Sequence, residues 1–307
     1  MRDVFIEALT ELAVEREDVF LITGDLGFGV LDKFAERFPR QYLNVGVAEQ
    51  NMTGIAAGLA LEGYRVFTYS IANFSTLRCL EQIRNDVCYH DANVTVVSIG
   101  GGFGYGALGM SHHATEDLSI MRAIPNLRVL VPGDDYEAME ATKYAASTPG
   151  PSYLRLERAP VKSVDTIEEP FTYGKIRVLQ KGDDFSVFCS GGVTAIAMNV
   201  AKALKREGIA IRVHSVHSLK SIDKNVVSAA VSETKGLITL EENNLKGGLG
   251  SAISEVCMDF GLYPKKFVRL GLHDTYSSVV GSQEFLRSHY GIDEAKLEKT
   301  IRSMIEV

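Results

Sequence analysis

Several features that mark specialised classes of protein are missing from this chain of 307 residues. Its four cysteines lie far apart with no C-x-x-C pair, so we expect no disulfide framework or zinc ribbon, and a reducing cytoplasm fits best. No run approaches about 20 apolar residues, so a membrane-spanning helix is not expected. The net charge of −7 argues against a broad basic surface for nucleic acid. Residues 1–7 lack the apolar block of a signal peptide.

The composition that remains is that of a soluble globular protein. Hydrophobic residues make up 46% and charged residues 23% of the chain, which is enough to build a core of ordinary size. The length alone predicts about two domains.

Short apolar runs that predict strands alternate with helical patterns through both halves of the chain. The predicted strands of the first half are residues 19–23, 42–45, 64–69, 94–99, 127–131 and 152–156. Those of the second half are residues 185–189, 211–215 and 236–240. The clearest predicted helices are residues 49–61, 73–89, 193–206 and 249–260. This alternation predicts an α/β protein with two parallel-sheet domains, residues 1–160 and 171–307, joined by a linker around residues 159–170.

A glycine-rich segment between strands matches a nucleotide-binding pattern in its letters but not in its context. Residues 104–109 read G-Y-G-A-L-G, and Asp134 follows where a ribose-binding acid would lie. The segment follows the fourth predicted strand rather than the first, and it does not lead directly into a long helix. A loop whose glycines allow close backbone approach is the favoured interpretation. The sequence has no P-loop, and the adjacent His112 and His113 have no further ligand at metal-binding spacing.

Five segments of the chain, taken together in their order and spacing, indicate the protein family more specifically than any single motif. Residues 45–60 read V-G-V-A-E-Q-N-M-T-G-I-A-A-G-L-A, and they are followed by N-F…E-Q-I-R at 73–84, G-M-S-H-H-A-T-E-D at 109–117, R-A-I-P-N…V-P-G-D at 122–134 and L-E-E-N…G-G-L-G-S-A at 240–252. In order and spacing, this series resembles the transketolase family over nearly the whole chain.

The resemblance covers only part of a whole transketolase. Whole members of the family begin with another domain, which carries a G-D-G motif and binds the diphosphate of thiamine diphosphate through Mg²⁺. This sequence has no such motif. The resemblance therefore implies a pyrimidine-binding domain followed by a C-terminal domain, as in the second subunit of a split transketolase. Its expected partner is an N-terminal transketolase-like subunit that carries the diphosphate and Mg²⁺ site, in a heterotetramer.

Glu49 is the main catalytic candidate that the resemblance implies. In this family a glutamate donates a hydrogen bond to N1′ of the aminopyrimidine of thiamine diphosphate, so that N4′ can act as a base. A glutamate in an apolar pocket is able to hold the required proton. Without the motif, Glu49 would be interpreted as a first-turn helix residue favoured by the helix dipole.

The other predicted site residues come from matching family positions. Phe74 matches an aromatic residue that packs on the aminopyrimidine ring, and Ile71 stands near it where another Phe is frequent. His112 matches a histidine that contacts the substrate near the reacting carbon, and His113, which replaces the usual Gln, is a neighbouring substrate candidate. Outside the family context, Phe74 would be a core residue and His112 a loop histidine.

The phosphate-binding positions are partly kept and partly changed. Arg2 and Arg158 match two arginines that hold a sugar phosphate. Gly29 stands in place of a phosphate-binding Ser or Thr, Gly100 or Gly101 in place of a substrate-binding His, and Leu108 in place of an Asp. We therefore expect ketol transfer on a small sugar substrate other than the usual pentose phosphates, and we expect the run 100–102 to leave room for a bulkier group.

Two alternative functions stay open at this point. One is a 2-oxo-acid decarboxylating subunit, either the β subunit of a dehydrogenase or a deoxyxylulose-phosphate-synthase-like half. The other is a non-catalytic subunit that stabilises its partner. We also expect the apolar helix residues to supply a subunit interface; they are Ile55, Ala56, Leu59, Ile83 and Val87.

Overall fold

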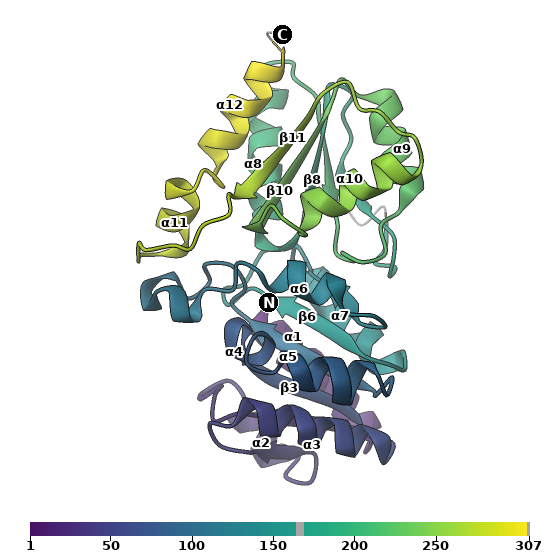
Figure 1. Cartoon of the computed structure of the whole chain (residues 1–307), viewed down its shortest axis with the longest axis vertical. Helices are drawn as coiled ribbons and strands as arrows, with labels where there is room; N and C mark the ends of the chain where they lie inside the picture. Colours follow the sequence, from purple (N-terminus) through teal and green to yellow (C-terminus); the bar gives the residue numbers. More distant parts are fainter. Residues whose placement is uncertain (164–168, 306–307) are drawn as a thin grey trace.

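The computed structural model describes residues 1–163 and 169–305, which form two α/β domains stacked along the long axis of the molecule (Figure 1). The predicted linker partly falls on residues 164–168, which lie outside the described residues. Within the described part of the chain, none of the helices has the length and hydropathy that would let it cross a membrane.

The first domain is built on a parallel sheet of six strands in the order β2-β1-β3-β4-β6-β5. Its strands are β1 (Val19–Thr23), β2 (Tyr42–Asn44), β3 (Arg65–Ile71), β4 (Val94–Ile99), β5 (Arg128–Leu130) and β6 (Ser152–Leu156). Each of them was expected from its apolar run, although Leu43 and Asn44 of the edge strand β2 are exposed.

Helices cover both faces of this sheet. They are α1 (Arg2–Glu15), α2 (Asp32–Arg37), α3 (Glu49–Leu61), α4 (Ala72–Thr76), α5 (Leu80–Gln82), α6 (Asp117–Ala123) and α7 (Asp135–Ser147). Leu21 and Ile22 of β1 point to opposite faces, and each is fully buried in a different apolar cluster. One cluster contains residues of α1 and α7, and the other contains residues of α3 and α6.

The long helix predicted at 73–89 is broken into three pieces. After α4 the chain makes a turn, forms the single helical turn of α5 and continues as the π-helix η1 (Ile83–Cys88). Within α4, the Thr76 hydroxyl donates to the Ala72 carbonyl at 2.6 Å and the Ser75 hydroxyl donates to the Ile71 carbonyl at 3.2 Å. Such bonds bend helices, and the resulting turn holds Arg78.

The second domain has a mixed sheet of five strands in the order β11-β10-β8-β9-β7. Its strands are β7 (Arg177–Gln180), β8 (Phe185–Cys189), β9 (Ile211–Ser215), β10 (Leu237–Asn244) and β11 (Phe267–Leu272). The edge strand β7 runs antiparallel to β9, and the other pairs are parallel. Its helices are α8 (Thr194–Lys205), α9 (Lys224–Glu233), α10 (Leu249–Asp259), α11 (Gln283–His289) and α12 (Glu294–Ile305). The structure therefore confirms the α/β class, with one antiparallel edge.

The apolar residues expected to form a subunit interface lie mainly inside the chain's own core. Ala56, Ile83 and Val87 are fully buried, and Ile55 and Leu59 are partly buried and pack against the same cluster. The expectation was wrong for Ala56, Ile83 and Val87, because helical spacing marks a buried face without showing whether it is buried within the chain or between chains. For the partly exposed Ile55 and Leu59 it stays a prediction. The exposed side of α3 instead carries Gly54, Gly58 and Leu61.

Candidate functional site

The predicted site residues gather at one edge of the first sheet, where its parallel strands end. Glu49 follows β2, Phe74 follows β3, His112 follows β4 and Arg158 follows β6. Arg2 joins this edge from α1, because the amino group of Met1 donates a hydrogen bond to the Ala159 carbonyl at 3.0 Å. Ligands of α/β proteins bind outside the carboxyl ends of the strands, so the topology alone places these residues where a site belongs.

Glu49 is the first residue of α3 and is 2% exposed. Its carboxylate pairs with Arg78, with 2.7 Å between Glu49 Oε2 and Arg78 Nη1. The carboxylate also lies close to the backbone of Gly24, where an added Cβ would stand 3.4 Å from Glu49 Cγ. A buried carboxylate needs a partner of this kind, because an isolated charge away from water is costly.

Aromatic and cationic groups continue from Glu49 in a row along the edge. The Arg78 guanidinium lies 4.8 Å from the centroid of the Phe74 ring. The Phe74 ring meets His112 edge to face at 5.0 Å, and His112 lies 6.5 Å from the ring of Tyr105. The Arg158 guanidinium lies 5.0 Å from the Tyr105 centroid. The structure thus brings Glu49, Phe74, His112 and Arg158 into one continuous row.

A cavity of about 570 Å³ opens at the far end of this row. It is lined by both predicted arginines and by glycine-rich backbone from the two domains; the residues are Arg2, Gly104, Tyr105, Gly106, Ala107, Leu108, Arg158, Ala159, Gly281, Ser282 and Gln283. Burial raises the pKa of Tyr105, and the two arginines act against this shift. Two guanidinium groups facing one cavity suit an anionic substituent on a small molecule.

His112 and His113 have different surroundings although they are adjacent. His112 is half-buried, and its Nδ1 lies 3.0 Å from the Ser111 hydroxyl. His113 is 4% exposed, its ring packs on Phe103 at 5.1 Å, and its Nε2 lies 3.2 Å from the Gly106 carbonyl oxygen. The structure places His113 beneath the loop and does not join it to the row.

Ile71 is the last residue of β3 and is half-buried at the start of the turn that leads to Phe74. Its carbonyl accepts the hydrogen bond from Ser75 that bends α4. The structure therefore puts Ile71 next to the row, a few residues before the aromatic ring.

The expectation that residues 100–102 leave space for a bulky substrate group was wrong. A Cβ on Gly100 would clash with the Tyr105 ring, one on Gly101 with the Arg155 guanidinium, and one on Gly102 with the Glu242 side chain. Side chains of this protein already fill the space beside these glycines. Nothing lies within 4 Å of a Cβ added to Gly29, and Leu108 is 57% exposed at the cavity.

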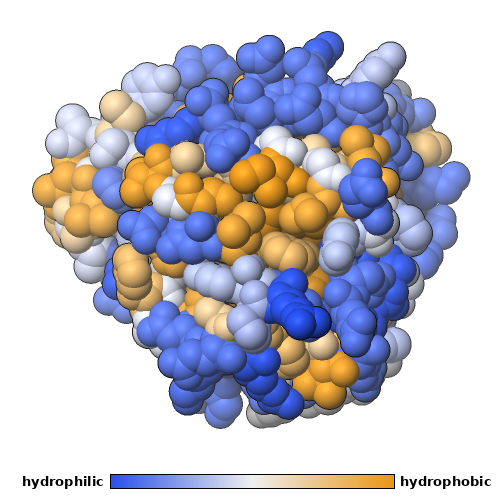
Figure 2. All heavy atoms as spheres, turned by 90° about the horizontal axis from the view of Figure 1, so that it is seen from below, coloured by the Kyte–Doolittle hydropathy of each residue, from blue (hydrophilic) through white to orange (hydrophobic). Residues whose placement is uncertain are grey.

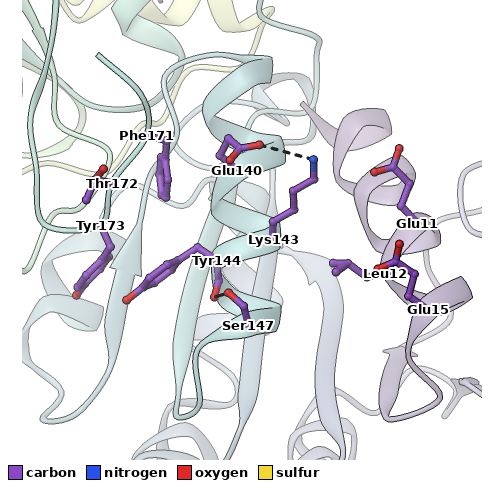
Figure 3. A pocket seen from close by; sticks show the side chains of 10 residues that line it. All are labelled: Glu11, Leu12, Glu15, Glu140, Lys143, Tyr144, Ser147, Phe171, Thr172 and Tyr173. Atoms are coloured by element: carbon purple, nitrogen blue, oxygen red, sulfur yellow. Dashed lines mark hydrogen bonds and ion pairs between the residues drawn. The ribbon is translucent and has the colours of Figure 1, made fainter.

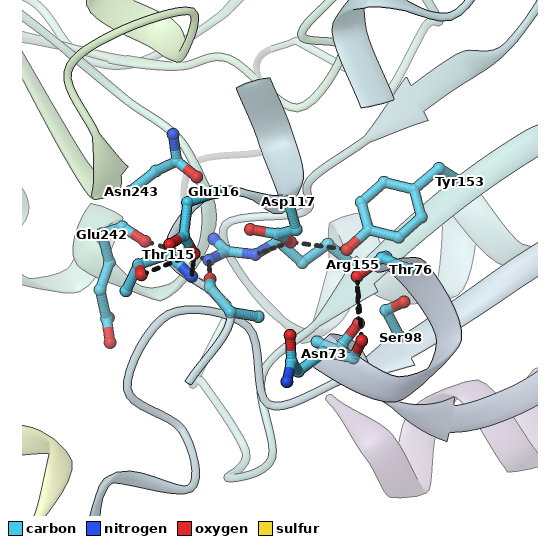
Figure 4. A network of polar contacts seen from close by, with 12 residues as sticks. Asn73, Thr76, Ser98, Thr115, Glu116, Asp117, Tyr153, Arg155, Glu242 and Asn243 are labelled. Atoms are coloured by element: carbon cyan, nitrogen blue, oxygen red, sulfur yellow. Dashed lines mark hydrogen bonds and ion pairs between the residues drawn. The ribbon is translucent and has the colours of Figure 1, made fainter. Parts of the chain in front are cut away.

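A buried polar network holds the glycine-rich loop against the second domain (Figure 4). Arg155 pairs with Asp117 at 2.9 Å and donates to the Ala114 and Glu242 carbonyls at 3.1 and 3.0 Å. The Tyr153 hydroxyl donates to Asp117 at 2.6 Å; burial and the Asp117 charge raise the pKa of Tyr153 well above its usual value. The hydroxyl therefore keeps its proton, and the network fixes the loop that carries His112.

Glu242 connects this network to the cavity lined by Arg2 and Arg158. Its side chain accepts from the Phe103 backbone N–H at 2.6 Å and from Arg287 Nε at 2.6 Å. Gln283, which lines the cavity, donates to Glu242 at 3.1 Å. The second domain thus shapes one wall of the cavity through residues that also hold the loop of the first.

A larger cavity lies elsewhere in the chain. It has a volume of about 770 Å³ and opens between α1, α7 and residues 171–173, with Tyr144 and Tyr173 stacked at 5.0 Å (Figure 3). None of the predicted site residues lines it. Among the described residues, no group of three or more His, Cys, Asp or Glu side chains is arranged to hold a metal ion.

Arg78 and Tyr105 belong to the row but were missed by the sequence reasoning. Tyr105 lies inside the glycine-rich segment, and Arg78 lies within the helix predicted at 73–89. Helical spacing gave no signal for Arg78, because Arg78 lies in the turn that follows α4 and not on a helix face.

Comparisons with known proteins identify the family of this chain. The family model for the transketolase pyrimidine-binding domain matches residues 1–163, and that for the transketolase C-terminal domain matches residues 174–297. A putative transketolase C-terminal section of Methanocaldococcus jannaschii is 35% identical over 98% of this chain and 95% of its own length. One of the subunits of the apulose-4-phosphate transketolase of Phocaeicola vulgatus is 33% identical over 99% of this chain and 97% of its own length.

A solved structure described as a split-gene transketolase in an inactive β4 tetramer superimposes with a TM-score of 0.90. It is 35% identical to this chain, and the match covers 99% of this chain and 98% of the other. The sequence matches, the strand order and the row of residues after the strands all lead to the same conclusion: this chain belongs to the transketolase family, as a pyrimidine-binding domain followed by a C-terminal domain.

Proposed function

We propose that this chain is the second subunit of a split, thiamine-diphosphate-dependent transketolase-like enzyme that transfers a two-carbon ketol unit between sugar-type substrates. The observation that carries the proposal is the buried carboxylate of Glu49, which opens a row of aromatic and cationic groups at the carboxyl edge of the sheet. Relatives named as subunits of apulose-4-phosphate transketolases support the same function.

The residues present fit the aminopyrimidine end of thiamine diphosphate. Glu49 offers a buried carboxyl group, and Phe74 offers a half-buried aromatic ring that contacts Arg78 and His112. Thiamine diphosphate supplies the nucleophilic carbon that accepts the ketol unit. Glu49 would hold a proton for the aminopyrimidine, Phe74 and Ile71 would support its ring, and His112 would donate to or accept from the substrate oxygen nearest the reacting carbon.

The substrate would extend from His112 toward Arg158. Arg2 and Arg158 both line the far cavity, which supports a sugar carrying an anionic group at the end away from the reacting carbon. His113 would act indirectly, by supporting the loop from below.

A partner subunit would complete the site. It would hold the diphosphate and Mg²⁺, and the assembly would be a heterotetramer. Hydrophobic side chains gather across the face seen from below in Figure 2, the end of the molecule at which α2 and α3 lie in Figure 1. Phe28 and Val47 in the loops of this region are each 75% exposed, and Leu61 of α3 is 62% exposed. Exposed apolar groups of this kind suit a protein interface.

Four free, buried cysteines support a reducing cytoplasmic location.

Glu49→Gln tests the proposed function. In the complete complex with the partner subunit, we expect this change to lower kcat by about 10²–10⁴-fold, because an amide cannot supply the proton of a carboxyl group. Glu62→Gln, an exposed glutamate at the other end of α3, is the matched control and should keep normal activity. Light scattering should show that both variants still assemble. Near-normal kcat for Glu49→Gln would mean that Glu49 has a structural role only.

A further inference from the structure

Arg78 contacts both of the residues to which the proposed function assigns the aminopyrimidine ring. Its guanidinium is 2.7 Å from Glu49 Oε2 and 4.8 Å from the Phe74 centroid, so one planar cation contacts both groups. An ion pair needs the Glu49 carboxylate, whereas a hydrogen bond donated to the cofactor needs the protonated carboxyl group. The ion pair with Arg78 and a hydrogen bond donated to the cofactor therefore require different protonation states of Glu49.

The backbone at Arg78 is fixed, but its side chain has room to move. Arg78 lies in the turn between α4 and α5, next to Cys79, which is fully buried and whose thiol donates to the Phe74 carbonyl at 3.4 Å. The Arg78 side chain is 47% exposed although its partner Glu49 is 2% exposed. Among the described residues, Glu49 is the carboxylate that pairs with Arg78. A long side chain on a fixed turn, with one end in solvent, can swing out without disturbing the fold.

We propose that Arg78 is a gating residue, which closes the pyrimidine site of the chain when no cofactor is bound and must leave before the aminopyrimidine can enter. This inference rests on the proposed function, because it takes Glu49 and Phe74 as the pyrimidine-binding pair. In the closed state Arg78 balances the buried charge of Glu49 and covers the exposed ring face of Phe74. The free energy needed to displace the guanidinium then weakens the observed affinity for the cofactor.

The proposal predicts that removal of the guanidinium tightens pyrimidine binding by the chain alone. Calorimetry with 4-amino-5-hydroxymethyl-2-methylpyrimidine should give an affinity about tenfold or more higher for Arg78→Ala than for the unmodified chain, since a charge-assisted contact no longer has to be broken. Arg78→Lys should lie between the two. Arg84→Ala removes an exposed arginine from the neighbouring η1 helix and should change nothing.

A double-mutant cycle tests whether Arg78 acts through Glu49. In the Glu49→Gln background, which has no carboxylate to pair with, the Arg78→Ala change should no longer tighten binding. Thermal melting of each variant checks that it is folded. Equal affinity of the chain and Arg78→Ala, or absence of binding by every variant, would overturn the gating role.

Binding of thiamine diphosphate by the complete complex separates this inference from the proposed function. If the complex of the unmodified subunits binds thiamine diphosphate and Arg78→Ala leaves pyrimidine affinity unchanged, the gate is wrong and the function stands. If that complex fails to bind thiamine diphosphate, the proposed function itself fails.

Discussion

At the scale of single residues, the row from Glu49 to Arg158 separates two tasks. The Glu49 and Phe74 end suits the cofactor, and the Arg2, Tyr105 and Arg158 end suits the distal group of the substrate. Arg158 is exposed and lies over the Tyr105 ring, so it is free to meet an anion at the rim of the cavity.

Replacement of Arg158 should affect substrate binding more than turnover. For Arg158→Met in the complete complex, we expect KM for a sugar with a terminal phosphate or sulfonate to rise about 10–100-fold, because a bidentate charge-assisted contact is lost. A sugar without an anionic group should be used equally well by both proteins. Steady-state kinetics measure both effects, with Arg206→Met, an exposed arginine after α8, as the control. An unchanged KM for the anionic sugar would remove Arg158 from the substrate site.

His214 predicts a pH dependence of stability. Its ring is stacked on Phe188 at 4.2 Å, and burial lowers its pKa to about 3. An unfolded histidine has a pKa of about 6.5, so below that pH this site binds more protons in the unfolded chain than in the folded one. The free energy of unfolding should therefore fall on acidification, by up to about 1.4 kcal/mol per pH unit for this group.

The contribution of His214 can be isolated by comparison with His214→Phe. Burial raises the pKa of Glu241 to about 7, which acts in the opposite direction, so the curve of the unmodified protein alone does not separate the two groups. Chemical denaturation between pH 7 and pH 5 should show a smaller loss of stability on acidification in His214→Phe. Equal pH slopes for the two proteins would contradict the account.

At the scale of secondary structure elements, the exposed side of α3 is the place to test partner docking. Gly58 faces solvent, and nothing lies within 4 Å of a Cβ added there. Small residues on a helix surface allow close approach of another element. This exposed side lies on the same helix as Glu49, so a partner that reaches the cofactor site would meet it.

A bulky side chain at Gly58 should block association without harming the fold. Gly58→Trp removes a glycine from a helix interior, so the melting temperature of the separate chain should hold or rise. Sedimentation of the mixture with the partner subunit should show weaker association, whereas Asn225→Trp on the exposed side of α9 should behave like the unmodified chain. Normal assembly of Gly58→Trp would move the interface away from α3.

Elements with strong local patterns were predictable, and those that depend on tertiary contacts were not. All six strands of the first sheet follow from apolar runs, although two of the three residues of the edge strand β2 are exposed. The edge strand β7 was missed because it is short and is stabilised by pairing with β9, which lies well beyond it in the chain. The break after α4 and the position of Arg78 depend on side-chain hydrogen bonds that periodicity does not report. Glu49, Phe74, His112 and Arg158 were found through motifs, whereas Tyr105 needed the folded loop.

At the scale of the whole molecule, the two domains act as one scaffold for the site. The Arg155, Asp117 and Glu242 network joins them beneath the glycine-rich loop, and one apolar cluster contains residues of both. For the assembly, light scattering should give a symmetric heterotetramer of two copies of each subunit. A one-to-one heterodimer as the active species would contradict this expectation.

Titration of the partner subunit into this chain tests the central claim most directly. With thiamine diphosphate, Mg²⁺ and a range of ketose donors, this chain alone should show no ketol transfer. Activity should appear on addition of the partner and reach a plateau at equal subunit concentrations, because each site needs groups from both chains. Robust turnover by this chain alone would contradict the account.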